Sequence, residues 1–87
     1  MKYTLYVVIN SEYGEPSVFT SEKDAAIEVQ EDILNHAKYW DYTDEDELED
    51  VQRAIDEFDE ARRQNREYCG TYLGELKVGY YKREIEL

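Results

Sequence analysis

The sequence predicts a small α+β domain in which two helices cover one face of an antiparallel sheet. Two patterns lead to this prediction. Apolar residues alternate near both ends of the chain, as in strands, and recur at spacings of three and four in the middle, as in amphipathic helices. No repeat or linker divides residues 1–87, so we expect a single domain with the order ββααββ.

Residues 2–9 are expected to form a strand with apolar side chains on both faces: Tyr3, Leu5, Val7 and Ile9 on one, and Tyr6 and Val8 on the other. Because both faces are apolar, we expect a central strand, and Tyr3 is predicted to face the core. Gly14 and Pro16 mark a turn over residues 11–16. Residues 17–20 then complete a hairpin.

The first helix is expected to begin at Ser21, whose hydroxyl can accept a hydrogen bond from the backbone N–H of Asp24. Its buried face is predicted from a helical spacing that joins Ala26, Val29, Ile33, Ala37 and Trp40. Ile27 and Leu34 would form an apolar shoulder beside this face. The opposite, solvent-facing side would carry Asp24, Glu28, Glu31 and Asn35.

Thr43, at the end of a connection over residues 41–43, is predicted to cap the second helix, which would end near Glu67. Its buried stripe would consist of Leu48, Val51, Ile55 and Phe58. The charges at its two ends suit the helix dipole, because the first turn is acidic and the last turns carry Arg62, Arg63 and Arg66.

Residues 68–87 are predicted to form two strands. Leu76, Val78 and Tyr80 alternate in one phase, and the opposite phase contains Tyr81, Arg83, Ile85 and Leu87. This change of phase predicts a turn or bulge near Gly79. Tyr81, like Tyr3, is predicted to face the core.

The acidic residues are concentrated in the predicted helices. The net charge is −12, and residues 22–60 contain 16 acidic and 3 basic residues, against 6 and 7 in the remainder. An acidic chain is repelled by nucleic acids and anionic lipids, so we expect neither direct nucleic-acid nor membrane binding. No apolar run approaches the roughly 20 residues of a membrane span, and no signal peptide is recognisable, so a cytoplasmic location is expected.

The second predicted helix has the highest charge density. Its residues 44–60 contain ten carboxylates and only one base, Arg53. At about 1.5 Å per residue this gives roughly one charge per 3 Å, close to the ~3.4 Å spacing of a nucleic-acid strand. Like-charged pairs such as Asp46/Asp50 and Asp56/Glu60 destabilise a helix. The cost favours a use for these carboxylates in binding, although a solvated face or halophilic adaptation would give the same composition.

The candidate partner-binding residues combine these acids with two tyrosines beside the helix connection. A tyrosine flanked by carboxylates suits an arginine-rich partner, because the guanidinium stacks on the ring and pairs with the acid. The expected site consists of Glu28, Glu31, Tyr39, Tyr42, Asp44, Glu45, Asp46, Glu49, Asp50, Asp56, Glu57 and Glu60.

No pattern of catalytic or metal-binding residues is recognisable. An EF-hand loop beginning at Asp44 fails, because Leu48 and Ile55 would occupy ligand positions. His36 and Cys69 are the only histidine and cysteine, so they form neither a zinc site of usual composition nor a disulfide. We expect Cys69 to pack at the junction between helix and strand. We therefore expect a protein without enzymatic activity, cofactor or metal.

In length, charge and the acidic helix over residues 44–60, the chain resembles small phage proteins that inhibit host defence nucleases, the anti-CRISPR and anti-restriction proteins. The resemblance implies a non-catalytic inhibitor that occupies the basic nucleic-acid groove of a nuclease or CRISPR effector by mimicking nucleic acid. Two alternatives remain open. One is an adaptor or immunity-type protein that neutralises another basic protein, and the other is a structural homo-oligomer that uses its tyrosine-rich sheet face or its last strand. A monomer and a homodimer are both compatible with the sequence.

Overall fold

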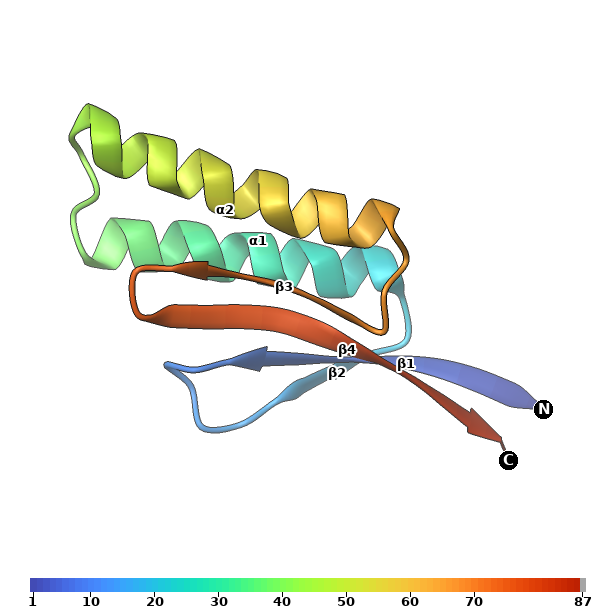
Figure 1. The fold of residues 1–87 in the computed structure, drawn as a ribbon. Helices are drawn as coiled ribbons and strands as arrows, with labels where there is room; N and C mark the ends of the chain where they lie inside the picture. The colour runs from blue at the N-terminus through green and yellow to red at the C-terminus, as the bar shows by residue number, and fades with distance from the viewer. Residues whose placement is uncertain (87) are drawn as a thin grey trace.

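The computed structural model describes residues 1–86 and has the predicted order ββααββ. The elements are β1 (Lys2–Asn10), β2 (Ser17–Phe19), α1 (Glu22–Tyr39), α2 (Glu45–Arg63), β3 (Tyr68–Leu73) and β4 (Leu76–Glu86) (Figure 1). The strands form one antiparallel sheet in the order β2-β1-β4-β3. Two hairpins from opposite ends of the chain therefore meet through β1 and β4. The prediction that β1 is a central strand is confirmed.

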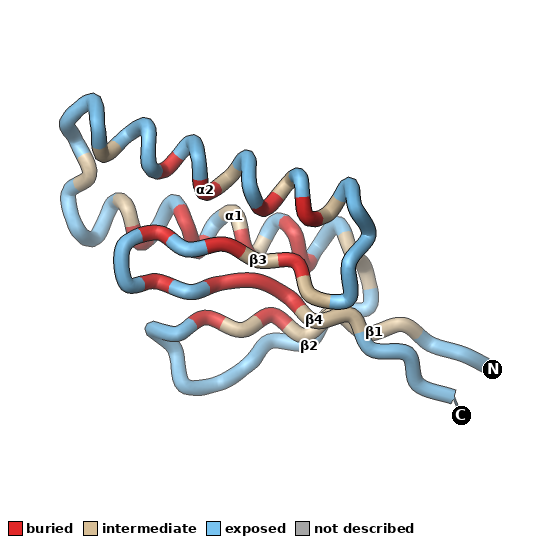
Figure 2. The backbone as a smooth tube through the Cα atoms, in the orientation of Figure 1, coloured by how far each residue is buried: buried red, intermediate tan, exposed pale blue. Residues whose placement is uncertain are grey.

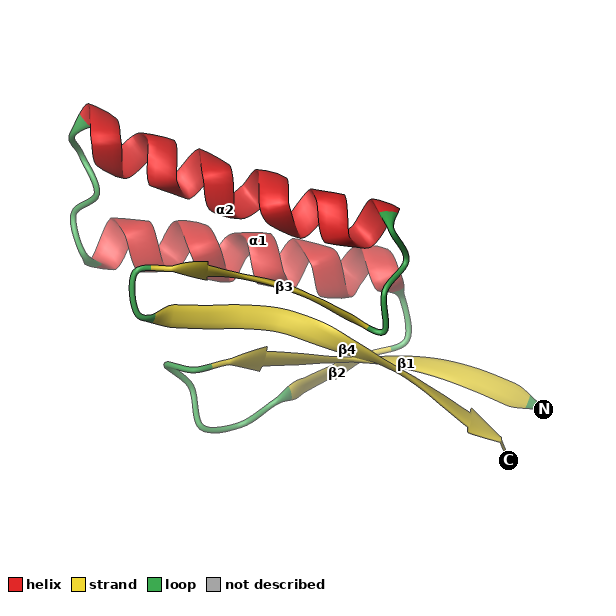
Figure 3. Cartoon of the chain, in the orientation of Figure 1, coloured by secondary structure: helices red, strands yellow, loops and turns green. Residues whose placement is uncertain are grey.

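The two helices lie on one face of this sheet, as predicted (Figure 3). Their buried sides and the centre of the sheet form one apolar core, which Figure 2 shows as buried positions between the two layers. The largest fully buried side chains are Val29 and Ile33 of α1, Phe58 of α2, Cys69 and Leu73 of β3, and Leu76 and Val78 of β4. This two-layer arrangement leaves the outer side of both helices in solvent.

Ser21 caps α1 as predicted, with its hydroxyl accepting from the Asp24 N–H at 3.3 Å. The prediction that Thr43 caps the second helix is wrong, because Asp44 does so. The Asp44 carboxylate accepts from the Glu47 N–H at 2.9 Å, and the Glu47 carboxylate accepts from the Asp44 N–H at 3.3 Å. This reciprocal capping box fixes the start of α2. The helix ends at Arg63 rather than near Glu67, since Asn65 has a φ of 52°, which no right-handed helix contains.

Two side chains predicted to be buried are exposed. Leu48 and Trp40 are 54% and 58% exposed, and the shoulder residues Ile27 and Leu34 are 42% and 52% exposed. Leu48 and Trp40 are exposed because the end of the helical layer that carries the α1–α2 connection extends past the β3–β4 turn (Figure 1). Small residues, Ala54 and Ala61, complete the buried stripe of α2 instead.

The last hairpin turns at Gly74, with a φ of 59°, and not at Gly79 as predicted. β4 runs without a bulge and pairs with β1 continuously from Lys2↔Glu86 to Asn10↔Val78. The change of phase in the sequence arises because β4 is apolar on both faces, with Tyr80 toward the helices and Tyr81 away from them. The final residue of the predicted pattern, Leu87, lies outside the described residues.

No helix among residues 1–86 covers the second face of the sheet, which we call the open face. By strand alternation and register it carries Tyr3, Leu5, Val7 and Ile9 of β1, Val18 of β2, Tyr68, Gly70 and Tyr72 of β3, and Lys77, Gly79, Tyr81, Arg83 and Ile85 of β4. The prediction that Tyr3 and Tyr81 face the core is therefore wrong. Both strands are apolar on two faces, but only one face is packed against the helices.

Candidate partner-binding site

The first two turns of α2 carry the densest charge in the molecule. Six of the seven residues from Asp44 to Asp50 are acidic, and we call them the acidic segment: Asp44, Glu45, Asp46, Glu47, Glu49 and Asp50. All are exposed except Glu47, which is half-buried. Six carboxylates over about 10.5 Å of helix amount to one per ~1.75 Å, comparable to the ~1.7 Å spacing of charges along duplex DNA.

None of these six carboxylates forms an ion pair within the part of the chain that the structure describes. Asp44 and Glu47 accept backbone hydrogen bonds in the capping box, with no cationic side chain involved. The backbone that holds the acidic segment is therefore fixed by the same residues that supply part of its charge. A rigid row loses little conformational entropy when a cationic surface binds it.

The second half of α2 is partly neutralised by the protein's own arginines. Arg53 pairs with Glu57 at 3.0 Å, Arg62 approaches Asp59 at 3.5 Å, and Arg63 pairs with Glu60, whose pKa it lowers. Asp56 accepts a hydrogen bond from Gln52 and has no cationic partner among residues 1–86. The continuous row of carboxylates without a cationic partner is therefore limited to the N-terminal half of α2. Asp56, Glu57 and Glu60 remain exposed, but only Asp56 adds full charge.

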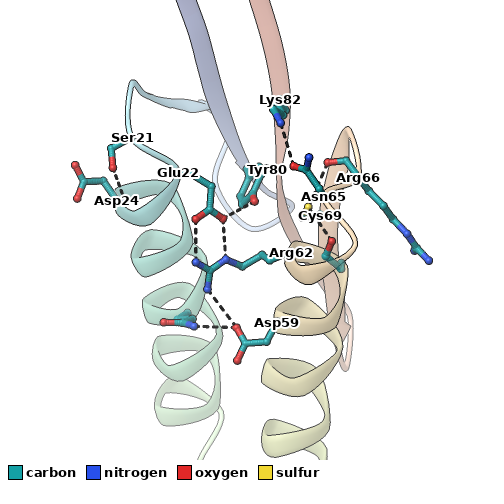
Figure 4. Close-up of polar contacts among 12 residues, drawn as sticks. Ser21, Glu22, Asp24, Asp59, Arg62, Asn65, Arg66, Cys69, Tyr80 and Lys82 are labelled. Carbon is teal, nitrogen blue, oxygen red and sulfur yellow. Dashed lines mark hydrogen bonds and ion pairs between the residues drawn. The ribbon is translucent and has the colours of Figure 1, made fainter.

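Arg62 of α2 and Glu22 of α1 form the centre of a polar network that links the two helices to each other and to the sheet (Figure 4). Arg62 forms a bidentate pair with Glu22, at 2.7 and 2.9 Å, and the Tyr80 hydroxyl donates to the same carboxylate at 2.6 Å. The hydrogen bonds from Arg62 hold the pKa of Glu22 below its usual value, against the opposing effect of burial. This network orients α2, and with it the acidic segment, relative to the sheet.

The α1 candidates do not join the acidic segment. Gln30 faces α2, because its amide donates to Asp59 at 3.2 Å. Alongside burial, the negative charges of Glu28 and Glu31 instead raise the pKa of Asp32, which lies beside Asn10 of β1. On a helix, Glu28 is about 200° from Gln30, so it lies on the flank remote from α2. The predicted site is therefore divided between two surfaces, and its acidic centre belongs to α2 alone.

The aromatic candidates gather where α1 ends. Tyr39 is 77% exposed and its ring contacts Trp40 edge-on at 5.3 Å, whereas Tyr42 is half-buried against the core and His36. Tyr39 and Trp40, with Tyr13 from the β1–β2 loop, line a hollow of about 450 Å³. Exposed rings beside carboxylates are suited to contact with guanidinium groups. Of the two candidate tyrosines, therefore, only Tyr39 presents an exposed ring.

Two acids that line the same hollow were not among the predicted site residues. One is Glu12, whose carboxylate accepts a hydrogen bond from His36 Nδ1 at 2.6 Å. The other is Asp32, which is only 7% exposed. Burial, followed by the neighbouring charges of Glu28 and Glu31, raises the pKa of Asp32, while a hydrogen bond with Asn10 opposes the rise. The signal for Asp32 was its spacing, three residues after Val29 and four before His36, which places it on the buried side of α1.

We expect Asp32→Asn to stabilise the fold at neutral pH. Because the pKa of Asp32 is raised in the folded state, folding disfavours its charge, and stability falls as pH rises from about 4 through the raised pKa. Asparagine carries no charge at any of these pH values. Urea denaturation at pH 7 should show an unfolding free energy higher by about 1 kcal/mol, the usual size of a stabilising substitution. The gain should vanish at about pH 3, and an equal gain at both pH values would contradict this explanation.

The histidine and the cysteine lie at opposite ends of β3. His36 lies beside Gly74, just after the end of the strand, whereas the Cys69 thiol, near its start, donates to the carbonyls of Ala61 and Arg66 at 3.5 Å. The expected packing of Cys69 at the helix–strand junction is confirmed. Within residues 1–86, no group of three or more acidic, histidine or cysteine side chains has a geometry that could hold a metal ion. Neither described helix is long and apolar enough to cross a membrane.

Comparisons with protein-family models, with curated proteins and with solved structures gave no match to this chain.

Proposed function

We propose that this protein is a non-catalytic inhibitor that binds the basic nucleic-acid groove of a nuclease or CRISPR effector through the acidic segment of α2. The observation that carries the proposal is the uncompensated charge of that segment, six carboxylates on two turns of helix with no basic residue among them. Arginines and lysines arranged for phosphates accept a comparable row of carboxylates, because both present anionic oxygens at similar spacing.

The ion pairs of α2 make the two ends of this surface different in charge. Its N-terminal end carries full charge, while at its C-terminal end Arg62 pairs with Glu22, which also accepts a hydrogen bond from Tyr80. The exposed rings of Tyr39 and Trp40 lie where α1 ends, just before the acidic segment in the sequence. A partner that binds the carboxylates could also stack arginines on these rings, which would add apolar area to an otherwise polar contact.

The proposal is tested by DNA cleavage with purified restriction nucleases and CRISPR effector ribonucleoproteins, each mixed with increasing amounts of this protein. We expect saturable inhibition of at least one of these enzymes and direct binding to it without DNA. Inhibition should weaken steeply as salt rises toward about 1 M, where the Debye length falls to ~3 Å. If no enzyme is inhibited, or if inhibition occurs without binding to the enzyme, the proposal is wrong.

A further inference from the structure

The open face is apolar at its centre and almost without charge. Leu5, Val7 and Ile9 run along its middle strand, β1, and Val18, on the neighbouring edge strand, is 58% exposed. On the other side, Tyr72 is 57% exposed, and the Tyr68 and Tyr81 rings pack together at 4.6 Å. Among residues 1–86, Lys77 and Arg83 are the only charged residues on this face. Contiguous apolar surface of this kind marks an interaction site.

The projecting ends of β1 and β4 show that the apolar pattern is specific to the open face. These ends extend beyond the helices, so neither face of the ribbon is covered there (Figures 1 and 2). On the helix side the residues are polar: Lys2, Glu84 and Glu86 are exposed, and Thr4 is half-buried. On the open side Tyr3, Leu5 and Ile85 continue the apolar surface to the end of the described strands, interrupted only by Arg83 opposite Leu5. Solvent reaches both sides of the ribbon in the single chain. The difference between its polar helix side and its mainly apolar open side is explained if another surface covers only the open side when the protein functions.

The isolated chain also exposes more surface than a compact monomer of its size. Its accessible surface is 5993 Å², whereas a compact monomer of 10.4 kDa exposes about 5,400 Å². The radius of gyration is 13.5 Å, against about 12 Å for a compact domain of this length. Both differences agree with a protein that buries further surface by association.

We propose that the open face binds the open face of a second copy of this chain, forming a two-fold symmetric dimer of stacked sheets. The four strands contain 9, 3, 6 and 11 described residues, so at ~3.4 Å per residue and ~4.8 Å between strands the face has a projected area of about 470 Å². This is of the order of the ~800 Å² of accessible surface that each partner buries in a stable interface. Stacked sheets pack about 10 Å apart, with the side chains of the two faces interdigitated.

The distribution of charge favours a second copy over a charged partner. In a face-to-face dimer both acidic helical layers point outward, on opposite sides of the assembly, where solvent screens their repulsion. The two bases of the open face are already engaged, since Arg83 pairs with Glu67 and lies 5.2 Å from the Tyr81 ring, and Lys77 lies 5.9 Å from the Tyr68 ring. An anionic partner would therefore find little available charge, while another apolar sheet would find complementary surface.

Sedimentation equilibrium of the full chain tests this proposal, over concentrations from about 1 to about 200 µM. We expect the mass to rise from 10.4 kDa toward twice that value, with a dissociation constant in the micromolar range. Raising the salt concentration should leave the dimer intact or strengthen it, because apolar burial drives the association. A chain that stays monomeric at every concentration would overturn the proposal.

Variants identify the face that is used. Val18→Arg places a charge on a residue that is already 58% exposed, so we expect the fold to survive and dimerisation to weaken at least tenfold. Val7→Arg, at the centre of the face, should abolish dimerisation, with circular dichroism used to confirm folding. The matched control is Leu34→Arg, at a 52% exposed residue of α1, which should dimerise as the wild type does. If Val18→Arg dimerises normally, or if the control alone loses the dimer, the open face is not the interface.

Discussion

Gly79→Ala is expected to unfold the protein or to lower its unfolding free energy by at least about 3 kcal/mol, at the upper end of overpacking effects. A Cβ on Gly79 would lie 2.5 Å from the Cys69 carbonyl oxygen and 2.6 Å from the Gly70 Cα. Both atoms belong to the backbone of β3, which is paired with β4 at this point. The clash therefore cannot be relieved by rotating a side chain, and the two strands must separate. Urea denaturation followed by circular dichroism measures the loss.

Gly14→Ala is the matched control for this substitution. Gly14 lies in the β1–β2 turn, and a Cβ there would meet no atom within 4 Å. We expect its unfolding free energy to stay within about 0.5 kcal/mol of the wild type, as for most surface substitutions. Similar stabilities for the two variants would contradict the close approach of β3 and β4 at Gly79.

Charge reversal in the acidic segment should abolish partner binding without harming the fold. Glu49→Lys with Asp50→Lys places lysines four residues after Glu45 and Asp46, where oppositely charged pairs stabilise a helix by ~0.2–0.5 kcal/mol each. Two new like-charge contacts, between Arg53 and the lysines introduced four and three residues before it, offset part of this gain. We expect stability to change by less than about 0.5 kcal/mol and affinity for the inhibited enzyme to fall at least 100-fold, equivalent to about 2.7 kcal/mol.

The control for this variant keeps the same net charge. Glu15→Lys with Glu75→Lys changes two exposed acids in turns outside α2, so it alters the total charge of the protein equally. A general electrostatic attraction would weaken equally in both double variants. A specific site predicts that the control retains its affinity within about threefold, a difference of only ~0.7 kcal/mol. Equal losses in the two double variants would mean that α2 is not the binding site.

The order of elements followed from the sequence because local patterns were strong. The alternation in β1 and the Ser21 cap each express a single local preference, and the structure agrees with both. The start of α2 was ambiguous because Thr43 and Asp44 are both good capping residues. The glutamate three residues after Asp44 completes a capping box, and that spacing would have identified the correct cap.

Other errors arose where tertiary geometry overrides periodicity. Leu48 and Trp40 continue their helical stripes in the sequence, but the sheet beneath them has already ended. A strand that is apolar on both faces, such as β1, shows that both faces are suited to burial without showing what covers each one. For the candidate site, composition predicted the acidic surface. The pairing of Arg53 with Glu57 at 3.0 Å depends on side-chain geometry that composition does not contain.

The most direct test of the proposed mimicry is competition with nucleic acid. Binding of this protein to the inhibited enzyme would be measured at fixed salt with increasing amounts of the enzyme's own duplex DNA. If the acidic segment occupies the phosphate-binding groove, the apparent dissociation constant should rise in proportion to the DNA concentration, with no complex containing both. If the DNA leaves the affinity unchanged, or if all three components form one complex, the carboxylates of α2 do not take the place of phosphates.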